Sequence, residues 1–255
     1  MSKAVVLLSG GIDSATVLAM ALEENDEVLA VSFNYGSNHN AVERTAAERI
    51  VEWYVVGGHE LVLREVELPP VFGGGKSALF SEIPMPEMSY KEIAENVGPS
   101  PTVVPFRNAN LISLATTLAV VHDAQLVYAG MHAEDARGFA YPDCTAMFLG
   151  PMAACVYVGT YHKVQLKVPF QWLMKRDIVE RAYALGVPAH LTWSCYRPVT
   201  APETQGGGAY HCGKCPTCVE RIEAFKANNL IDPVAYAPGI NIDWAECDPY
   251  ELDAE

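Results

Sequence analysis

Basic residues are scarce in this sequence. Its 255 residues include 17 lysines and arginines against 31 aspartates and glutamates, which gives a formal net charge of −14 at pH 7. No stretch of the chain is rich in lysine or arginine. Because an acidic surface repels a phosphate backbone, this composition disfavours a nucleic-acid-binding protein and favours one that acts on small molecules.

Long hydrophobic runs are missing as well. No apolar segment approaches the roughly 18 residues that a membrane-spanning helix needs, and no basic segment precedes a hydrophobic one near the first residue. We therefore expect neither a membrane span nor a signal peptide, and we expect a cytoplasmic protein. Hydrophobic residues still make up 50% of the chain, which is enough to bury one sizeable core, or a core with a small appendage.

The clearest local pattern lies near the first residue. The apolar run 4–7 predicts a buried strand and residues 14–24 predict a helix, so Ser9-Gly10-Gly11 falls at a strand-to-helix turn. A helix start leaves backbone N–H groups unpaired, and glycines let the backbone approach an anion closely. The turn therefore predicts a phosphate site, with a plain capped helix start as the alternative.

Side chains around this turn suit the same ligand. Ser9, Ser14 and Thr16 would add hydroxyl donors. A carboxylate beside phosphate calls for a cation between them, and Mg²⁺ is commonly shared by one carboxylate and phosphate oxygens, so Asp13 is the predicted magnesium ligand. No lysine follows the glycines, which excludes the Walker phosphate loop.

Strands and helices are predicted to alternate along the chain. We expect strands at 4–7, 27–33, 61–66, 125–130 and 163–168, and helices at 14–24, 40–53, 111–122 and 175–185. This alternation predicts parallel βαβ units with right-handed crossovers, and so an α/β fold with a Rossmann-like doubly wound parallel sheet. Ligands of such sheets bind at the carboxyl ends of the strands.

Arg107 and Asn108 stand at the beginning of an apolar and therefore buried helix. An arginine is electrostatically misplaced there, because cations favour the C-terminal ends of helices. Binding of an anionic ligand would compensate for this, and pairing of Arg107 with a local carboxylate is the alternative. Three further polar residues, His39, Asp135 and Asp143, are expected at the same edge of the sheet, and each alone could be a helix-start residue.

Four of the seven cysteines are clustered: Cys195 is followed by Cys212, Cys215 and Cys218. Two-residue spacing lets successive thiolates turn onto one cation, and four sulfurs satisfy a tetrahedral Zn²⁺ without leaving an open position. The spacing therefore predicts one structural zinc ion. An iron–sulfur site is the alternative, but the surroundings show nothing that electron transfer needs.

Several motifs of the chain together resemble one family. The Ser-Gly-Gly-x-Asp-Ser turn is similar to the pyrophosphate loop of the ATP pyrophosphatases. The other motifs follow in order: Tyr35-Gly36 with His39 and Glu43, Val104-Pro105-x-Arg107-Asn108, His132-Ala133-x-Asp135, Tyr141-Pro142-Asp143-Cys144, and Cys195 with His211-Cys212-Gly213-x-Cys215-Pro216-x-Cys218. Over most of residues 3–228 the chain resembles the QueC family of 7-cyano-7-deazaguanine synthases.

This resemblance implies an architecture and a reaction. We expect an adenine nucleotide alpha hydrolase-like domain over 1–190, a zinc-binding helical region over 191–230 and an acidic extension over 231–255. The implied enzyme is an ATP-dependent carbon–nitrogen ligase and a homodimer, with structural Zn²⁺ and with Mg²⁺ bound to ATP. It would convert 7-carboxy-7-deazaguanine and ammonia to the nitrile 7-cyano-7-deazaguanine, through an adenylated carboxylate and an amide.

The resemblance also assigns residues. The implied ATP-binding residues are Leu8, Ser9, Gly10, Gly11, Ile12, Asp13, Ser14, Ala15, Thr16, Val17 and Leu18. The implied catalytic residues are Asp13, Ser14, Arg107, Lys163 and Lys175. The implied substrate-binding residues are Tyr35, His39, Arg107, Asn108, Asp135, Tyr141 and Asp143. Among the last group, Asp135 and Asp143 would accept hydrogen bonds from the donor edge of the deazaguanine.

The chain departs from the family at two places. Thr145 stands where the family usually has arginine, and the segment 148–152 is apolar and predicted to be interrupted at Gly150-Pro151, where the family has a polar helix. Two alternatives follow: an enzyme that stops at the amide or transfers the activated deazaguanine to an amine of a protein or nucleic acid, and a nucleotide-binding regulatory protein without turnover. The end of the chain, 243–255, carries six acids and no base and is predicted to be solvated.

Overall fold

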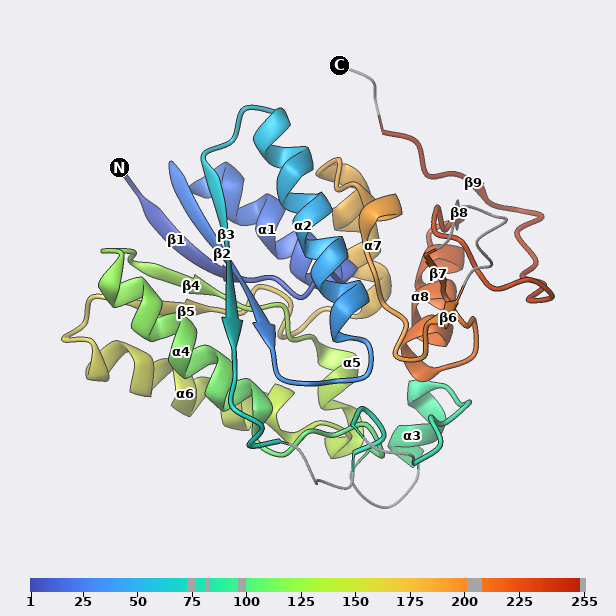
Figure 1. The fold of residues 1–255 in the computed structure, drawn as a ribbon, viewed down its shortest axis with the longest axis horizontal. Coiled ribbons are helices and arrows are strands. Elements are labelled where there is room, and N and C mark those ends of the chain that lie inside the picture. Colours follow the sequence, from blue (N-terminus) through green and yellow to red (C-terminus); the bar gives the residue numbers. More distant parts are fainter. Residues whose placement is uncertain (73–76, 81–82, 96–99, 201–207, 253–255) are drawn as a thin grey trace.

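A five-stranded parallel sheet forms the centre of the protein (Figure 1). The computed structural model describes residues 1–72, 77–80, 83–95, 100–200 and 208–252. The strands are β1 (Lys3–Leu7), β2 (Glu27–Asn34), β3 (Leu61–Glu67), β4 (Leu126–Tyr128) and β5 (Gln165–Lys167), in the sheet order β3-β2-β1-β4-β5. The chain extends the sheet from β1 to one side and then crosses to the other, which confirms the doubly wound α/β fold.

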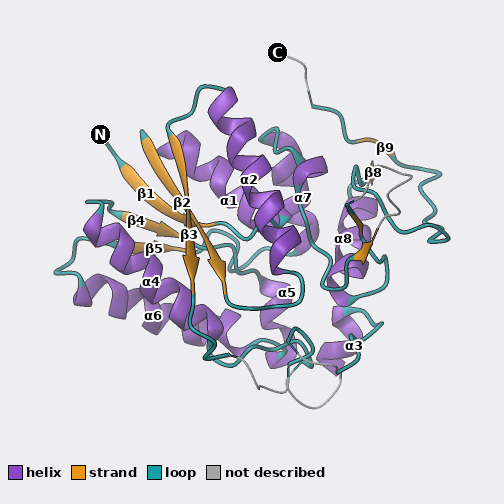
Figure 2. Ribbon diagram, in the orientation of Figure 1, coloured by secondary structure: helices purple, strands orange, loops and turns teal. Residues whose placement is uncertain are grey.

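Helices cover both faces of this sheet (Figure 2). The first face carries α1 (Ile12–Glu24), α2 (Asn40–Val56) and α7 (Lys175–Ala184), and the second carries α4 (Arg107–Val121) and α6 (Ala146–Gly159). Successive residues of β1 serve the two cores in turn, since Ala4 and Val6 pack into the first and Val5 into the second. A strand buried on both sides needs the continuous apolar run that the sequence shows.

The helix α6 differs from its prediction. It runs unbroken over 14 residues with Pro151 inside it. A proline removes one backbone hydrogen bond, but Leu149 and Val156, on either side of it, are both buried in the second core and hold the two halves in line. Thr145 begins the helix, because its side-chain oxygen accepts a hydrogen bond from the N–H of Phe148 at 3.3 Å. The expected interruption at Gly150-Pro151 is therefore wrong.

The C-terminal part of the chain packs beside the first core. It contains α8 (Pro216–Ala227) and two small sheets, β6 (Val199–Thr200) with β7 (Ala209–Tyr210) and β8 (Leu230–Ile231) with β9 (Asp248–Pro249). Trp244 and Tyr250 pack against the first core, and the Tyr250 hydroxyl donates to the carbonyl of Val187 at 2.9 Å. Most residues of 243–252 are exposed, as predicted, but Trp244 and Tyr250 are partly buried and hold the segment against the core.

Two further short α-helices are α3 (Tyr90–Glu95) and α5 (Ala133–Ala136). The first lies in the proline-rich part of the sequence, and the second directly follows β4 at the carboxyl edge of the sheet. Within the described ranges, none of the helices has the length and apolarity that a bilayer span requires.

Candidate active site

The turn between β1 and α1 owes its shape to Gly10. Its φ of +88° lies in the left-handed region, and a Cβ atom there would come within 2.5 Å of the carbonyl oxygen of Glu43 in α2. Only glycine meets both conditions. The next residue, Gly11, is the N-cap of α1 and has no side chain to satisfy the first N–H groups of the helix. These donors are therefore directed at whatever lies beyond the turn.

The two serines of the turn hold it together. The Ser14 hydroxyl donates to the carbonyl of Gly11 at 2.9 Å and lies 3.1 Å from the Ser9 hydroxyl. Both serines line a pocket at the carboxyl edge of the sheet. The third predicted hydroxyl donor, Thr16, is fully buried and donates to the carbonyl of Ile12 at 2.7 Å, so it is not directed at this pocket.

Only part of the predicted ATP-binding segment reaches the pocket. Leu8, Ser9, Asp13 and Ser14 line it. Four other members of the segment are buried in the hydrophobic core: Ile12, Ala15, Val17 and Leu18. The reason is the helical period, since a helix that packs on a sheet points most of its apolar side chains inward.

Asp13 is the charged residue of this turn and one of its oxygens is already engaged. Its Oδ2 accepts a hydrogen bond from Nζ of Lys175 at 2.6 Å, and Lys175 comes from the first turn of α7. The other oxygen, Oδ1, is buried and has no hydrogen-bond partner among the described residues. Burial alone would raise the pKa of Asp13, but Lys175 and His132 outweigh it and lower this pKa below its usual value.

The Asp13–Lys175 ion pair belongs to a larger buried cluster of charged residues. Lys175 Nζ also lies 3.3 Å from Oε2 of Glu220 in α8, and His132 Nε2 lies 3.5 Å from Oδ2 of Asp135. Burial raises the pKa of Glu220 to about 7, against the opposing effects of Lys175 and His132. For His132 the nearby carboxylates outweigh burial and raise its pKa. The structure thus places Lys175 beside Asp13, with Glu220 and His132 behind them.

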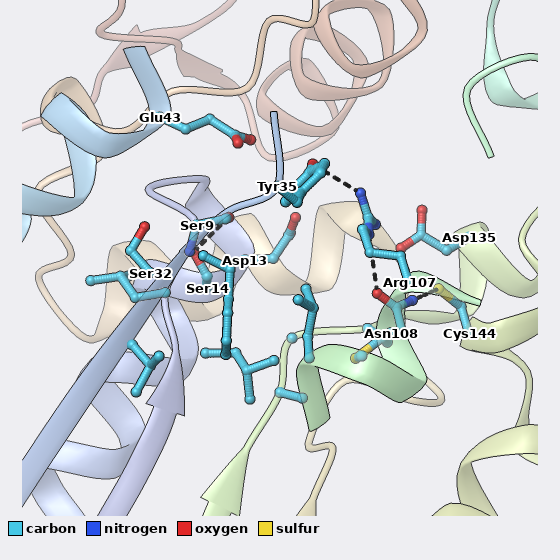
Figure 3. Close-up of a pocket in the computed structure, with 18 of the residues that line it drawn as sticks. Ser9, Asp13, Ser14, Ser32, Tyr35, Glu43, Arg107, Asn108, Asp135 and Cys144 are labelled. Atoms are coloured by element: carbon cyan, nitrogen blue, oxygen red, sulfur yellow. Dashed lines mark hydrogen bonds between the residues drawn. The ribbon is translucent and has the colours of Figure 1, made fainter. Parts of the chain in front are cut away.

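The opposite wall of the pocket carries Arg107, at the start of α4 (Figure 3). Its guanidinium donates to the Tyr35 hydroxyl at 3.2 Å and to Oδ1 of Asn108 at 3.4 Å. Among the described residues, Arg107 has no carboxylate within ion-pair distance, so the alternative of a local salt bridge has no support. A half-buried guanidinium beside a pocket, with no ion pair among the described residues, can bind an anion.

The predicted substrate residues divide into two groups. Tyr35, Arg107, Asn108 and Asp135 line the pocket. Asp143, His39 and Tyr141 are not among the residues that line it.

These three residues have structural partners instead. Asp143 Oδ2 accepts the backbone N–H of Asn108 at 3.0 Å and so caps α4. Tyr141 is buried and its hydroxyl bonds with Thr102. The His39 ring is buried 5.0 Å from the ring of Tyr196, which does line the pocket. These residues support the pocket walls from behind.

The structure does not bring Lys163 to the site. It is exposed and precedes β5, so it lies at the amino edge of the parallel sheet, whereas the pocket lies at the carboxyl edge. A lysine at one end of a strand cannot reach a ligand at the other end of the sheet. This placement contradicts a catalytic role for Lys163.

Four buried cysteines form a second centre, as the spacing predicts. Cys195, Cys212, Cys215 and Cys218 place their sulfur atoms within 4.8 Å of one another. Backbone N–H groups point at these sulfurs, from Cys212 to Cys195 at 3.2 Å and from Cys215 to Cys212 at 3.3 Å. Such donors stabilise thiolates rather than thiols. The residues could therefore hold a metal ion.

Sequence reasoning missed several residues of the site, among them three with polar side chains. Ser32 at the end of β2 and Tyr196 after Cys195 line the pocket, and Glu220 lies behind it. For Glu220 a signal existed, since two adjacent charged residues stand inside α8 at positions that its apolar neighbours mark as buried. For Ser32 and Tyr196 no local pattern distinguishes them from ordinary strand and loop residues.

Comparison with known proteins gives a consistent result. The family model described as "Queuosine biosynthesis protein QueC" matches residues 3–229. A 7-cyano-7-deazaguanine synthase of Pseudoalteromonas atlantica is 37% identical over 236 residues, which cover 92% of this chain and 99% of that protein. A protein of the same name from Thermoplasma acidophilum is 36% identical over 238 residues, which cover 92% of both chains.

Solved structures resemble the chain more distantly. The U34-tRNA thiolase NcsA of Methanococcus maripaludis, solved with its four-iron–four-sulfur cluster, superposes with a TM-score of 0.49 at 16% identity. The match covers 78% of this chain and 62% of the thiolase.

Proposed function

The chain belongs to the QueC family of queuosine biosynthesis proteins, and on this premise we propose that it converts 7-carboxy-7-deazaguanine and ammonia to 7-cyano-7-deazaguanine with ATP. Its relatives of that name align with it over almost their full length. The observation that carries the proposal is the placement of two anion-binding groups across one pocket, the open N-terminus of α1 with Asp13 and the guanidinium of Arg107.

The turn between β1 and α1 would bind the β- and γ-phosphates of ATP. The N–H groups of its first helical turn stabilise the charge that develops on pyrophosphate as it leaves. Lys175 Nζ lies 2.6 Å from Asp13 and adds a positive charge at the same end of the pocket. Ser14 fixes the turn rather than acting on the nucleotide, because its hydroxyl is engaged with Gly11.

Mg²⁺ fits the free oxygen of Asp13. Oδ1 of this residue is buried, lacks a partner among the described residues and belongs to a side chain that lines the pocket. When bound there with ATP, the ion would neutralise phosphate charge and make pyrophosphate a better leaving group. The carboxylate of Asp13 would hold it, since Lys175 engages only the other oxygen.

Arg107 would bind and orient the substrate carboxylate. Its planar guanidinium matches a carboxylate in two parallel hydrogen bonds, and Tyr35 and Asn108 hold the group in place. Asp135 would accept hydrogen bonds from the ring nitrogens and amino group of the deazaguanine, since its carboxylate lines the same pocket. This leaves the substrate carboxylate between Arg107 and the phosphate turn.

The reaction then requires two activations. In the first, a carboxylate oxygen bonds to the α-phosphorus of ATP and the bond to pyrophosphate breaks. Ammonia attacks the carbonyl carbon, the bond to AMP breaks and a proton is released, which leaves the amide. In the second, the amide oxygen bonds to the α-phosphorus of a second ATP, the bond to pyrophosphate breaks and a proton leaves the nitrogen. The carbon–oxygen bond to AMP then breaks and the remaining proton on the nitrogen is lost, which leaves the nitrile.

We assign Zn²⁺ to the four cysteines. The distances between Cys212 and Cys218 and between Cys195 and Cys215 are 4.0 Å from sulfur to sulfur. A tetrahedral ion with Zn–S bonds of about 2.3 Å needs an edge of about 3.8 Å, so the fit is close. A four-iron cluster attaches each cysteine to a different iron and needs sulfurs further apart. Four thiolate ligands require reducing surroundings, which is consistent with a cytoplasmic location of the protein.

A second copy of the chain would cover α6. This helix has no charged residue, and Met147 is 77% exposed and Val158 67% exposed on its outer side. Exposed apolar faces of this kind are typical of interfaces between subunits. We therefore assign the homodimer contact to α6, and sedimentation analysis of a Met147→Glu variant tests it.

The shared name of the relatives favours this reaction over the alternatives. Neither an amide as the final product, nor transfer to an amine of a protein or nucleic acid, nor a regulatory protein without turnover has comparable support. Thr145, the residue that prompted the first two, is explained by its cap on α6.

Incubation of the protein with ATP, Mg²⁺, ammonium and 7-carboxy-7-deazaguanine tests the proposal. The expected products are AMP, pyrophosphate and 7-cyano-7-deazaguanine, identified by mass. A Lys163→Ala variant is the matched control and should retain full turnover, because Lys163 lies at the other edge of the sheet. Absence of AMP with the unaltered protein would reject the function, and accumulation of the amide would reject the nitrile as its product.

A further inference from the structure

A second cavity lies behind the Asp13–Lys175 pair, between α5, the start of α7 and α8. Its lining includes the carboxylates of Glu134, Glu220 and Glu223. Lys175 lines it too, and its ammonium group contacts Asp13 of the active site. The cavity therefore adjoins the ATP pocket through a single layer of side chains.

Glu220 is the informative residue of this cavity. It is only 5% exposed, and its Oε1 has no hydrogen-bond partner among the described residues, although Nε2 of His132 lies 3.9 Å away. Its other oxygen lies 3.3 Å from Lys175. A carboxylate oxygen that is buried without a donor is costly. Such an oxygen at the wall of a cavity indicates a ligand that donates hydrogen bonds.

The charge around the cavity selects the sign of that ligand. Three glutamates line it, and the negative charges of Asp13 and Asp135 lie directly behind. Lys175, shared between Asp13 and Glu220, and His132, whose pKa is raised beside Asp135 and Glu220, offset two of these five negative charges. Arg176 also lines the cavity, but its exposed guanidinium pairs with Asp177. The net field attracts a cation.

We propose that this cavity binds the ammonium ion that supplies nitrogen to the reaction. The proposal rests on the proposed function, in which ammonia is the second substrate. An ammonium ion is small, carries one charge and has only hydrogen-bond donors, which matches a cavity whose free groups are carboxylate oxygens. A divalent ion is the competing ligand, because His132, Glu134 and Glu220 each place one ligand atom within 4.8 Å of the others. Lys175, whose ammonium group lies 3.3 Å from Glu220, repels a doubly charged ion more strongly than a singly charged one.

The position of the cavity would bring ammonia to the adenylate from outside the space that the other substrates occupy. In the proposed complex ATP and the deazaguanine fill the pocket between the phosphate turn and Arg107. The cavity meets that pocket at the Lys175–Asp13 pair, and an ammonium ion that leaves its fourth proton on a cavity carboxylate would enter the pocket there as ammonia. The acidic lining raises the local concentration of ammonium at that entrance.

Glu223 is the position at which to test this proposal. It lines the cavity from α8 but, unlike Glu220, has no contact with Lys175 among the described residues. Glu223→Gln should raise the KM for ammonium about threefold and Glu223→Lys about tenfold, while the KM for ATP stays within about twofold. The matched control is Glu180→Lys, which makes the same charge change at an exposed position of α7 outside the cavity.

A crystal soaked with thallium(I), a monovalent probe for ammonium, gives a readout that is independent of activity. The expected anomalous peak lies beside Glu220 and disappears in Glu223→Lys crystals. An unchanged KM for ammonium in Glu223→Lys, equal effects of the two lysine variants, or thallium found only elsewhere would overturn the proposal.

Exchange of labelled pyrophosphate into ATP separates this inference from the proposed function. The exchange should depend on 7-carboxy-7-deazaguanine and should need no ammonium. If the unaltered protein shows no exchange, the proposed function fails. If exchange occurs and the KM for ammonium does not respond to Glu223→Lys, only the ammonium site fails.

Discussion

Replacement of Arg221 should destabilise the whole protein. The side chains of Arg221 and Asp232 are both fully buried, and they form two hydrogen bonds of 2.7 and 2.9 Å. The same guanidinium donates to Thr192 at 2.7 Å and to the carbonyl of Ala189 at 3.1 Å. Arg221 therefore ties α8 to the segment that leads to Cys195.

The magnitude follows from the charge left behind. In Arg221→Met the carboxylate of Asp232 stays buried and keeps only weaker donors, including the Tyr236 hydroxyl at 2.7 Å. Breaking a buried pair in this way costs about 3–5 kcal/mol. For a chain of this length that corresponds to a fall in melting temperature of roughly 10 °C.

Urea unfolding of the zinc-loaded protein measures this loss. The matched control is Arg44→Met, which breaks exposed pairs with Glu48 at 3.0 Å and Glu65 at 2.7 Å and should cost less than about 1 kcal/mol. The double variant Arg221→Met with Asp232→Leu removes both charges and should regain most of the lost stability. A loss below about 1 kcal/mol in Arg221→Met, or no recovery in the double variant, would refute the reasoning.

Three further predictions concern the turn, the metal centre and pH. Gly10→Ala should lower the free energy of unfolding by more than about 2 kcal/mol and weaken ATP binding. Gly58→Ala, with a similar φ of +89° but open space around it, should lower it by only about 1 kcal/mol. Calorimetry of the two variants measures the difference. Cys212→Ser should lose bound zinc and lower the melting temperature, whereas Cys155→Ser, at an exposed cysteine, should change neither. Metal analysis and thermal melting of the two variants test this. Burial lowers the pKa of His211 to about 3, so the unfolded chain binds a proton at a higher pH than the folded one, and stability falls as pH drops from about 6.5 toward 3. His211→Gln should reduce the loss of stability between pH 7 and 5 by about 2 kcal/mol. Parallel curves of unfolding free energy against pH for the two proteins would contradict this prediction.

The parts of the fold that the sequence predicts are those set by local chemistry. The β1 run is apolar throughout because both faces of that strand are buried, and its turn needs glycine because α2 passes close to Gly10. Both requirements are met by residues within a few positions of each other, so they are visible in the sequence. The Cys212-x-x-Cys215-x-x-Cys218 spacing is equally local, and its sulfurs meet as predicted.

The errors come from partners that are distant in the sequence. Asp143 looks like a substrate ligand from its position, yet it caps α4 by accepting the N–H of Asn108, 35 residues earlier. Trp244 and Tyr250 pack on a core built from residues much earlier in the chain, which a window of acidic residues cannot reveal. The resemblance implies a catalytic role for Lys163, but the direction of β5 puts this residue at the amino edge of the sheet, away from the pocket.

The central claim is that the first turn of the chain binds the phosphates of ATP so that a carboxylate opposite it can be adenylated. A crystal structure with Mg²⁺ and an ATP analogue that cannot be cleaved tests this claim most directly. It should show the β- and γ-phosphates at the N–H groups that follow Gly10 and the metal ion on Asp13. A triphosphate bound elsewhere, with this turn unoccupied, would contradict the account.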